Sequence, residues 1–297
     1  MQTYFFTGKG GTGKTTISSA LARELSGVGY NTLLVSLDPA HNLQDIFELE
    51  ESGPESQITE NLRIIEPDFE KIKTEYFEGK VKFLRETTSH LSSFNIENYL
   101  DTLKYAPGQE EYAVMLFLRN LLFQRNKQPY QFIIFDTPPT GLLLKILSLP
   151  KLSLQWIRKL VELRAKIVDR REMISNIRNE DEKTKYYQKD QVLQQLRQQE
   201  NEYDKLREFY GSANFYIVMN PDILVEKETY RLKNNLFELD FEIDGIINNR
   251  CNKPYTFEYL NEKENNIIRI GAKENNGSRK YQLDLNLIKK LDISLSE

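Results

Sequence analysis

The sequence predicts an α/β fold in which a mostly parallel sheet is flanked by helices, with an α-helical subdomain inserted into it. Two observations predict this fold. Short apolar runs alternate with helical patterns, and a glycine-rich loop separates the first run from the first helix. The runs are rich in β-branched and aromatic residues, as buried parallel strands are. They lie at residues 3–6, 32–37, 132–135, 215–219 and 243–248.

The glycine-rich loop reads GKGGTGKT over residues 8–15, which is the GxxxxGK[ST] phosphate-binding pattern. Phosphates need many convergent donors, and glycine lets successive backbone N–H groups turn inward. An apolar run precedes the loop, and residues 16–25 have helical spacing, so the phosphates would meet a helix N-terminus. The sequence therefore predicts a P-loop NTPase. The expected nucleotide contacts here are Gly8, Lys9, Gly10, Gly11, Thr12, Gly13, Lys14, Thr15 and Thr16.

Bulk composition excludes several classes of protein. A formal charge of −4 over 297 residues provides no overall basic field, so nucleic acid is not expected as a partner. No apolar run is long enough to span a bilayer, and the phosphate loop begins at residue 8. We therefore expect a soluble, cytoplasmic protein. The single cysteine, Cys251, excludes an internal disulfide and a CxxC metal clamp, so no zinc site is predicted.

Two long insertions separate the strands, at about residues 66–106 and 151–210. The second has apolar residues at helical spacing, which resume at Ile174 and Ile177 after an interruption at Arg170, and this predicts a long amphipathic helix. A charged break and a second helical stripe follow, which predicts an antiparallel helical hairpin. Its first stripe is Leu152, Trp156, Leu160, Leu163 and Ile167, and its second is Val192, Leu196, Tyr203, Leu206 and Tyr210. Phe69, Ile72, Tyr76 and Phe83 form a further stripe in the first insertion. Each stripe is either a surface for a partner or ordinary packing between helices.

Two polar segments follow the second and third strands, where the strand ends should face the phosphates. Asp136 ends an apolar run and suits a Mg²⁺ ion held through water, with the Thr15 hydroxyl bound directly to the metal. Lys14 would bridge the β- and γ-phosphates.

Hydrolysis also needs a group that orients the attacking water. Asp38 is the first candidate and is included among the metal-site residues, with Asp45 second. The alternative for Asp38 is a turn-forming carboxylate before Pro39. His41 is interpreted as a hydrogen-bonding loop residue and not as a base.

Lys9 is an additional lysine, because the loop already has its phosphate-binding lysine at position 14. It is either a solvated charge or a cationic finger directed at another site.

Together these segments resemble the deviant Walker A ATPases, and among them the ArsA family of arsenite-efflux ATPases and tail-anchored-protein targeting factors. The motifs that carry the resemblance are GKGGTGKTT, DPAHNLQDIF, DTPPTGLLLKILSLP and the triplet Asn248-Asn249-Arg250. The resemblance covers about residues 1–250, with Leu142 where the family usually has histidine. It implies that residues 1–297 form a single ATPase domain that uses ATP and Mg²⁺.

The resemblance also implies roles for individual residues. Lys9 becomes a signature lysine that reaches the nucleotide of the partner in a homodimer, which places it with Lys14 and Asp38 in the catalytic set. Asn42 is implied as a first-switch residue and Pro138 as part of the second switch. Asn249, with Arg250 beside it, is implied as the adenine contact.

The leading hypothesis is a dimeric cytoplasmic ATPase whose cycle gates capture and release of a client protein, such as the transmembrane helix of a tail-anchored membrane protein. One alternative is a subunit that energises a membrane anion transporter of the arsenite type. Another is a positioning ATPase of the partitioning kind. Having one cysteine argues against metalloid activation through several cysteines and against relatives that hold an iron–sulfur cluster.

Overall fold

The computed structural model describes residues 1–39, 43–49, 55–87, 108–124, 130–177, 190–261, 265–271 and 286–295. Its centre is an eight-stranded sheet in the order β3-β4-β2-β5-β1-β6-β7-β8. All neighbouring strands are parallel except β3 and β4, which are antiparallel. The α/β fold with a mostly parallel sheet is thus confirmed.

The strands are β1 (Gln2–Thr7), β2 (Thr32–Ser36), β3 (Glu55–Thr59), β4 (Leu62–Ile65), β5 (Phe132–Asp136), β6 (Asn214–Met219), β7 (Gly245–Asn248) and β8 (Ile267–Arg269). The helices on the amino-terminal side are α1 (Lys14–Gly27), α2 (Leu43–Phe47), α3 (Phe69–Thr87) and α5 (Gln109–Gln124). Those that follow are α6 (Thr140–Ile177), α8 (Gln191–Gly211), α9 (Ile223–Glu238) and α10 (Leu287–Lys290).

Alternation along the buried strands divides the core into two layers. Successive side chains of a strand point to opposite faces, so Phe5 joins one cluster while Tyr4 and Phe6 join the other. The Phe5 cluster contains residues of α5, α6, α8 and α9, and the Tyr4 cluster contains residues of α1 and α10. Both faces of the central strands are therefore covered, which explains their uninterrupted apolar composition.

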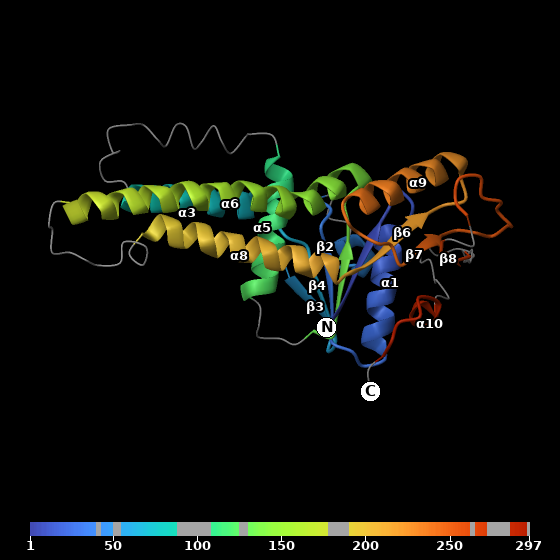
Figure 1. Ribbon diagram of the computed structural model, residues 1–297. Helices are drawn as coiled ribbons and strands as arrows, with labels where there is room; N and C mark the ends of the chain where they lie inside the picture. Colours follow the sequence, from blue (N-terminus) through green and yellow to red (C-terminus); the bar gives the residue numbers. More distant parts are fainter. Residues whose placement is uncertain are drawn as a thin grey trace.

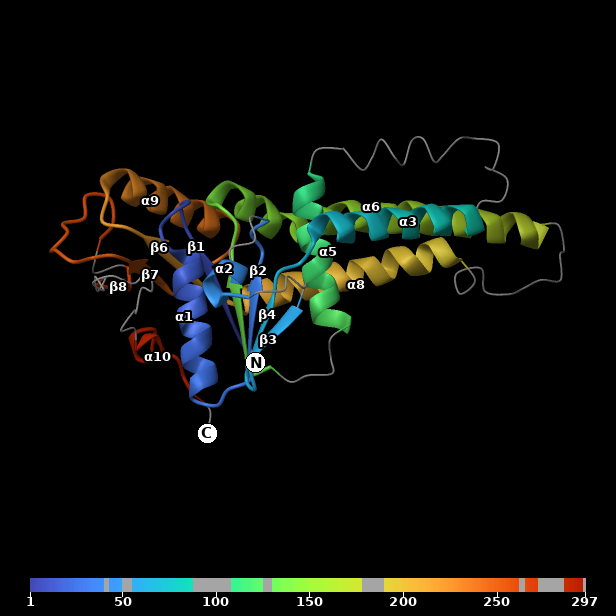
Figure 2. The same cartoon turned by 180° about the vertical axis from the view of Figure 1, so that it is seen from behind.

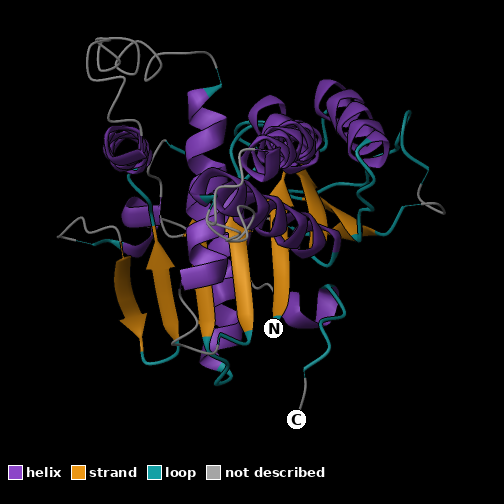
Figure 3. Ribbon diagram, turned by 60° about the vertical axis from the view of Figure 1, so that its left-hand side comes forward, coloured by secondary structure: helices purple, strands orange, loops and turns teal. Residues whose placement is uncertain are grey.

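Helices α3, α6 and α8 extend from the sheet as an arm (Figures 1 and 2). Seen from the tip of the arm, the sheet has helices on both of its faces (Figure 3). Along the arm α8 pairs with α6, because Arg158 contacts Glu200 and Asp204, and Arg164 contacts Asp190. No described helix is both long enough and apolar enough to cross a membrane.

The five predicted strands are present, whereas β3, β4 and β8 were not predicted. β3 has no apolar run, and β4 and β8 are only four and three residues long, which leaves too short a pattern for the prediction. The long amphipathic helix expected in the second insertion is confirmed, since α6 is one helix of 38 residues that continues through the interruption of the apolar pattern at Arg170. It also begins at Thr140, directly after the second polar segment, and the expected boundary at residue 151 lies inside it. The charged break at 179–183 lies outside the described residues.

The base of the arm shares the core of the sheet, which predicts a contrast between two leucines. Leu206 of α8 is fully buried in the cluster that contains Phe5, whereas the Leu163 side chain of α6 is 57% exposed. Leu206→Ala should lower the free energy of unfolding by about 3 kcal/mol, because it leaves a cavity. Leu163→Ala should change it by less than about 0.5 kcal/mol. Urea denaturation of both variants measures the difference, and equal losses would contradict a shared core.

Candidate nucleotide-binding site

The phosphate loop connects β1 to α1 and lies against the ends of β6 and β7. Gly8 has a φ of +146°, and a Cβ there would overlap the carbonyl oxygen of Val218. Gly13 has a φ of +97°, and a Cβ there would overlap the Asn249 side-chain amide. Both positions therefore need glycine for conformation and for space. Gly10 and Gly11 are exposed at the crown of the loop, and Thr16 is half-buried in the first turn of α1.

Two side chains of the loop bind its own backbone. The Thr12 hydroxyl donates to the Lys9 carbonyl at 2.9 Å, and the Lys14 ammonium contacts the same oxygen at 3.4 Å. Burial lowers the pKa of Lys14, and the carboxylates of Asp136, Asp38 and Glu228 oppose that shift. A buried ammonium within a glycine-rich phosphate-binding loop is suited to bind phosphate oxygens.

Asp136 ends β5 and is 1% exposed. Neither of its carboxylate oxygens has a hydrogen-bond partner among the described residues. Burial raises its pKa to about 7, while the Thr15 hydroxyl and the Lys14 ammonium act in the opposite direction. An incompletely compensated buried carboxylate beside a threonine hydroxyl fits a hydrated Mg²⁺ ion, which would supply charge neutralisation for the phosphates when bound.

The other residues of the two polar segments differ in their placement. Asp38 is half-buried and close enough to Lys14 and Asp136 to influence both pKa values. Asp45, the second candidate for orienting water, is exposed on α2. Pro138 is buried two residues beyond Asp136. Asn42 lies outside the described residues, as does His41.

Lys9 forms an ion pair within its own chain. Its ammonium lies 3.4 Å from Glu228 of α9, and the two side chains are 41% and 35% exposed. The other oxygen of Glu228 accepts the Thr140 hydroxyl at 3.2 Å, at the first residue of α6. Glu228 thus joins the phosphate loop to the start of the arm helix.

Asn249 and Arg250 follow β7 and differ strongly in exposure. Asn249 is buried; its side-chain amide donates to the Thr12 carbonyl at 2.9 Å, and its side-chain oxygen accepts the Arg250 N–H at 2.9 Å. Arg250 is exposed and has a φ of +57°. The side chain predicted as the adenine contact therefore also holds the phosphate loop in place.

One residue of the site was missed by the sequence analysis. Glu66 directly follows β4 and is 4% exposed, and one of its oxygens accepts the N–H of Leu43, the first residue of α2, at 2.7 Å. Its charge also contributes to the raised pKa of Asp136. A carboxylate at the end of an apolar run is the signal that identified Asp136, and it could have identified Glu66.

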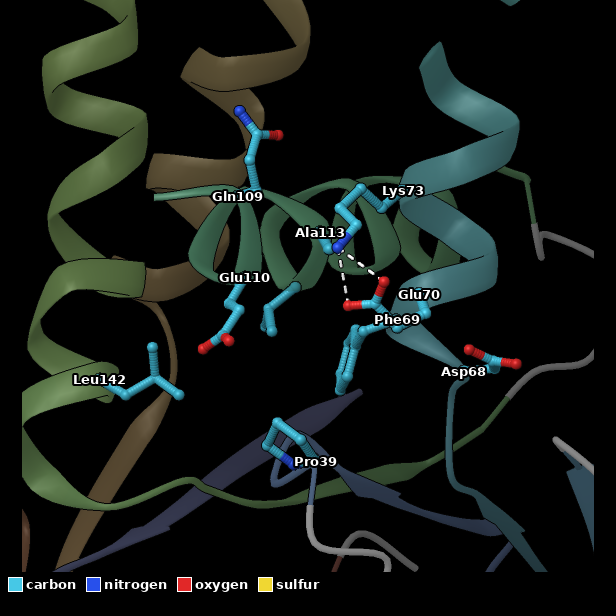
Figure 4. Close-up of a pocket in the computed structure, with 10 residues that line it drawn as sticks. Pro39, Asp68, Phe69, Glu70, Lys73, Gln109, Glu110, Ala113 and Leu142 are labelled. Atoms are coloured by element: carbon cyan, nitrogen blue, oxygen red, sulfur yellow. Dashed lines mark hydrogen bonds and ion pairs between the residues drawn. The ribbon is translucent and has the colours of Figure 1, made fainter. Parts of the chain in front are cut away.

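A cavity of about 200 Å³ separates the polar segment after β2 from the arm (Figure 4). Pro39 lies on one side of it and Leu142 of α6 on another, and the first turns of α3 and α5 complete the wall. An ion pair of 2.7 Å between Lys73 and Glu70 closes one edge. The helical arm and the catalytic edge of the sheet thus meet around an incompletely filled space, where a small shift of either requires little repacking.

Comparison with known proteins gives a consistent result. The family model described as anion-transporting ATPase, ArsA_ATPase, matches residues 1–268. The chain is 31% identical over 251 residues to a putative arsenical pump-driving ATPase 2 of Aquifex aeolicus, with 84% of this chain and 80% of that protein covered. It is 30% identical over 259 residues to ATPase ASNA1 homolog 1 of Paramecium tetraurelia, with 84% and 75% covered. For a putative arsenical pump-driving ATPase of Chlorobaculum tepidum the identity is 30% over 254 residues, and the chain spans 61% of that longer protein.

The raised pKa of Asp136 predicts how stability depends on pH in the absence of ligand. A carboxyl with a folded pKa near 7, above its ordinary value of 3.8, contributes stability that is lost as the pH rises through about 7. Relative to Asp136→Asn, the unliganded protein should therefore lose on the order of a few kcal/mol between pH 4 and pH 7. Urea denaturation of both proteins across this range measures it. If the free energy of unfolding depended on pH in the same way in both proteins, burial would not raise the pKa of Asp136 in the folded protein.

Proposed function

The chain belongs to the anion-transporting ATPase family, the ArsA ATPases, and is an ATP hydrolase; from this premise we propose that ATP binding and hydrolysis gate the capture and release of a client protein on the helical arm. In this proposal residues 1–297 act as one ATPase domain in a cytoplasmic homodimer. The client is an apolar helix of a membrane protein, such as that of a tail-anchored protein.

An exposed apolar stripe on α6 is the observation that carries the proposal. Its five members recur every three or four residues, so they lie on one face of the helix. They are Leu152 (50% exposed), Trp156 (73%), Leu160 (45%), Leu163 (57%) and Ile167 (44%). A contiguous apolar face of this kind marks a binding surface more often than single exposed residues do.

The stripe is not used to hold the described fold together. A different face of α6, with the buried Leu154, Ile157 and Val168, packs on the rest of the protein. Of the two interpretations that the sequence left open for this stripe, the described structure favours a surface for a partner. The stripe of α8 instead serves packing between helices, because its residues Tyr203, Leu206 and Tyr210 are buried.

The dimensions of the stripe suit a helical client. From Leu152 to Ile167 it extends about 22 Å, at about 1.5 Å per residue. A transmembrane helix presents an apolar surface about 30 Å long, most of which such a stripe could shield from water. Pairing two arms in a dimer would enclose a larger part of it.

The same helix connects this surface to the nucleotide. α6 begins four residues after Asp136, and its first residue binds Glu228, which also binds Lys9. A change at the γ-phosphate that moves either contact would move the start of α6, and with it the arm. We assign Asp38 to orienting the attacking water, Thr15 and Asp136 to Mg²⁺, and Lys14 to the phosphates.

Lys9 is proposed to act on the nucleotide of the partner protomer. Its ammonium would have to leave Glu228, which frees Glu228 and Thr140 at the moment of dimer closure. Exchange of this ion pair would couple closure of the dimer to the position of α6.

The stripe predicts a loss of client binding without a loss of ATP hydrolysis. The double substitution Leu160→Asp and Leu163→Asp places two charges on the surface, and it should reduce crosslinking of a tail-anchored protein made in vitro at least about tenfold. Basal ATP turnover should stay within about twofold, because neither side chain contacts the nucleotide site.

Phe237→Asp is the matched control, since Phe237 is 75% exposed on α9 and is not a member of the stripe. It should leave crosslinking unchanged. Equal effects of the two variants, or no effect of the double substitution, would contradict a client surface on α6. Crosslinking to a membrane permease instead of the tail-anchored protein would favour the transporter-energising alternative.

Complementation tests whether Lys9 acts across the dimer. Lys9→Ala and Asp38→Asn should each abolish hydrolysis, because one lacks the finger and the other the water-orienting group. In an equimolar mixture about a quarter of the wild-type activity should return, since half of the dimers are mixed and each has one complete site. If protomers are verified to exchange and the mixture is still inactive, Lys9 acts on the nucleotide bound by its own protomer.

A further inference from the structure

Residues Tyr255–Leu260 form an irregular segment that is organised around one carboxylate. The segment lies between β7 and β8 and contains neither helix nor strand. Glu226, in the first turn of α9, is 0% exposed and faces it. One of its oxygens accepts the backbone N–H groups of Glu258 at 2.9 Å, Tyr259 at 2.6 Å and Leu260 at 3.0 Å. The other accepts the Tyr255 hydroxyl at 3.0 Å.

This carboxylate is stabilised by backbone groups instead of by a cation. Among the described residues, no lysine or arginine forms an ion pair with Glu226. Successive N–H groups that converge on an anion, together with the positive end of a helix, can replace a counter-ion. Burial of a carboxylate is costly without such donors, so the conformation of the segment depends on Glu226.

The segment begins six residues after Asn249, which holds the phosphate loop. Asn249 binds the Thr12 carbonyl, and the chain continues from it through Arg250 to Tyr255. On the β5 side of the phosphate loop the strand ends carry Asp136 and Asp38. On the other side, next to β6 and β7, they carry Asn220 and Asn249, which are neutral hydrogen-bonding groups. A nucleotide whose phosphates bind the loop would therefore extend its base toward β7 and the segment beyond it.

We propose that Glu226 is a positioning residue for the nucleotide base: by gathering the N–H groups of residues 258–260, it fixes the segment that lines the base side of the site. It does not touch the nucleotide. The inference rests on the nucleotide site and not on the proposed client.

A graded set of substitutions tests the proposal in the full-length protein. Tyr255→Phe removes one hydrogen bond, Glu226→Gln keeps an acceptor but removes the charge, and Glu226→Leu removes all four bonds. The KM for ATP should rise by less than about twofold, by about threefold and by at least about tenfold, respectively, with kcat within about twofold throughout. The preference for ATP over GTP should fall in the same order.

Inorganic triphosphate separates positioning of the base from damage to the whole site, because it has phosphates and no base. Its affinity, measured by calorimetry, should stay within about twofold in all three variants. A parallel loss of triphosphate affinity, or an unchanged KM for ATP in Glu226→Leu, would overturn the proposal. If Glu226→Leu does not fold, the ATP-to-triphosphate ratio of Glu226→Gln decides in the same way. Client crosslinking is a separate readout, so failure of either proposal is recognised independently.

Discussion

The close approach of the phosphate loop to the ends of β6 and β7 is the constraint on which the nucleotide site depends. Gly8 lies where a side chain would meet the Val218 carbonyl, and Gly13 lies where one would meet the Asn249 amide. Because the loop is held between these neighbours, its backbone conformation is restricted before any ligand binds, and little ordering is needed on binding. The same Asn249 amide also donates to the Thr12 carbonyl. A single backbone geometry thus connects three strands to the site.

Three buried carboxylates near this edge of the sheet are stabilised in different ways, and the differences indicate their roles. Glu226 receives four hydrogen bonds and holds a loop. Glu66 receives one, from the start of α2, and has a second oxygen without a partner among the described residues. Asp136 receives none that the described residues supply, and burial raises its pKa. Incomplete compensation is typical of groups that bind a ligand, whereas full compensation is typical of groups that hold structure.

The long helix α6 unites two regions that would otherwise be separate. Its first turn lies at the nucleotide site and its middle packs on α8 (Figure 1), and the side chains of its stripe are exposed. A helix of 38 residues is stiff enough to transmit a displacement, and Pro150 removes one backbone hydrogen bond between the site and the stripe. Between α6 and the loop at Pro39 lies a cavity and not a filled core. This combination is what the proposed gating of the arm by the nucleotide requires.

The sequence by itself determined the fold class, the five principal strands and the phosphate loop, because these depend on local patterns of apolar residues and glycines. It also identified Asp136, since a carboxylate that ends a buried run can only lie at the edge of the sheet. Tertiary structure decided which of the helical stripes is buried, because the spacing of apolar residues in the sequence is the same whether or not another helix covers them. It alone brought Lys9 to Glu228, and Glu226 to residues 258–260, since these partners are distant in sequence and no local pattern encodes their distance.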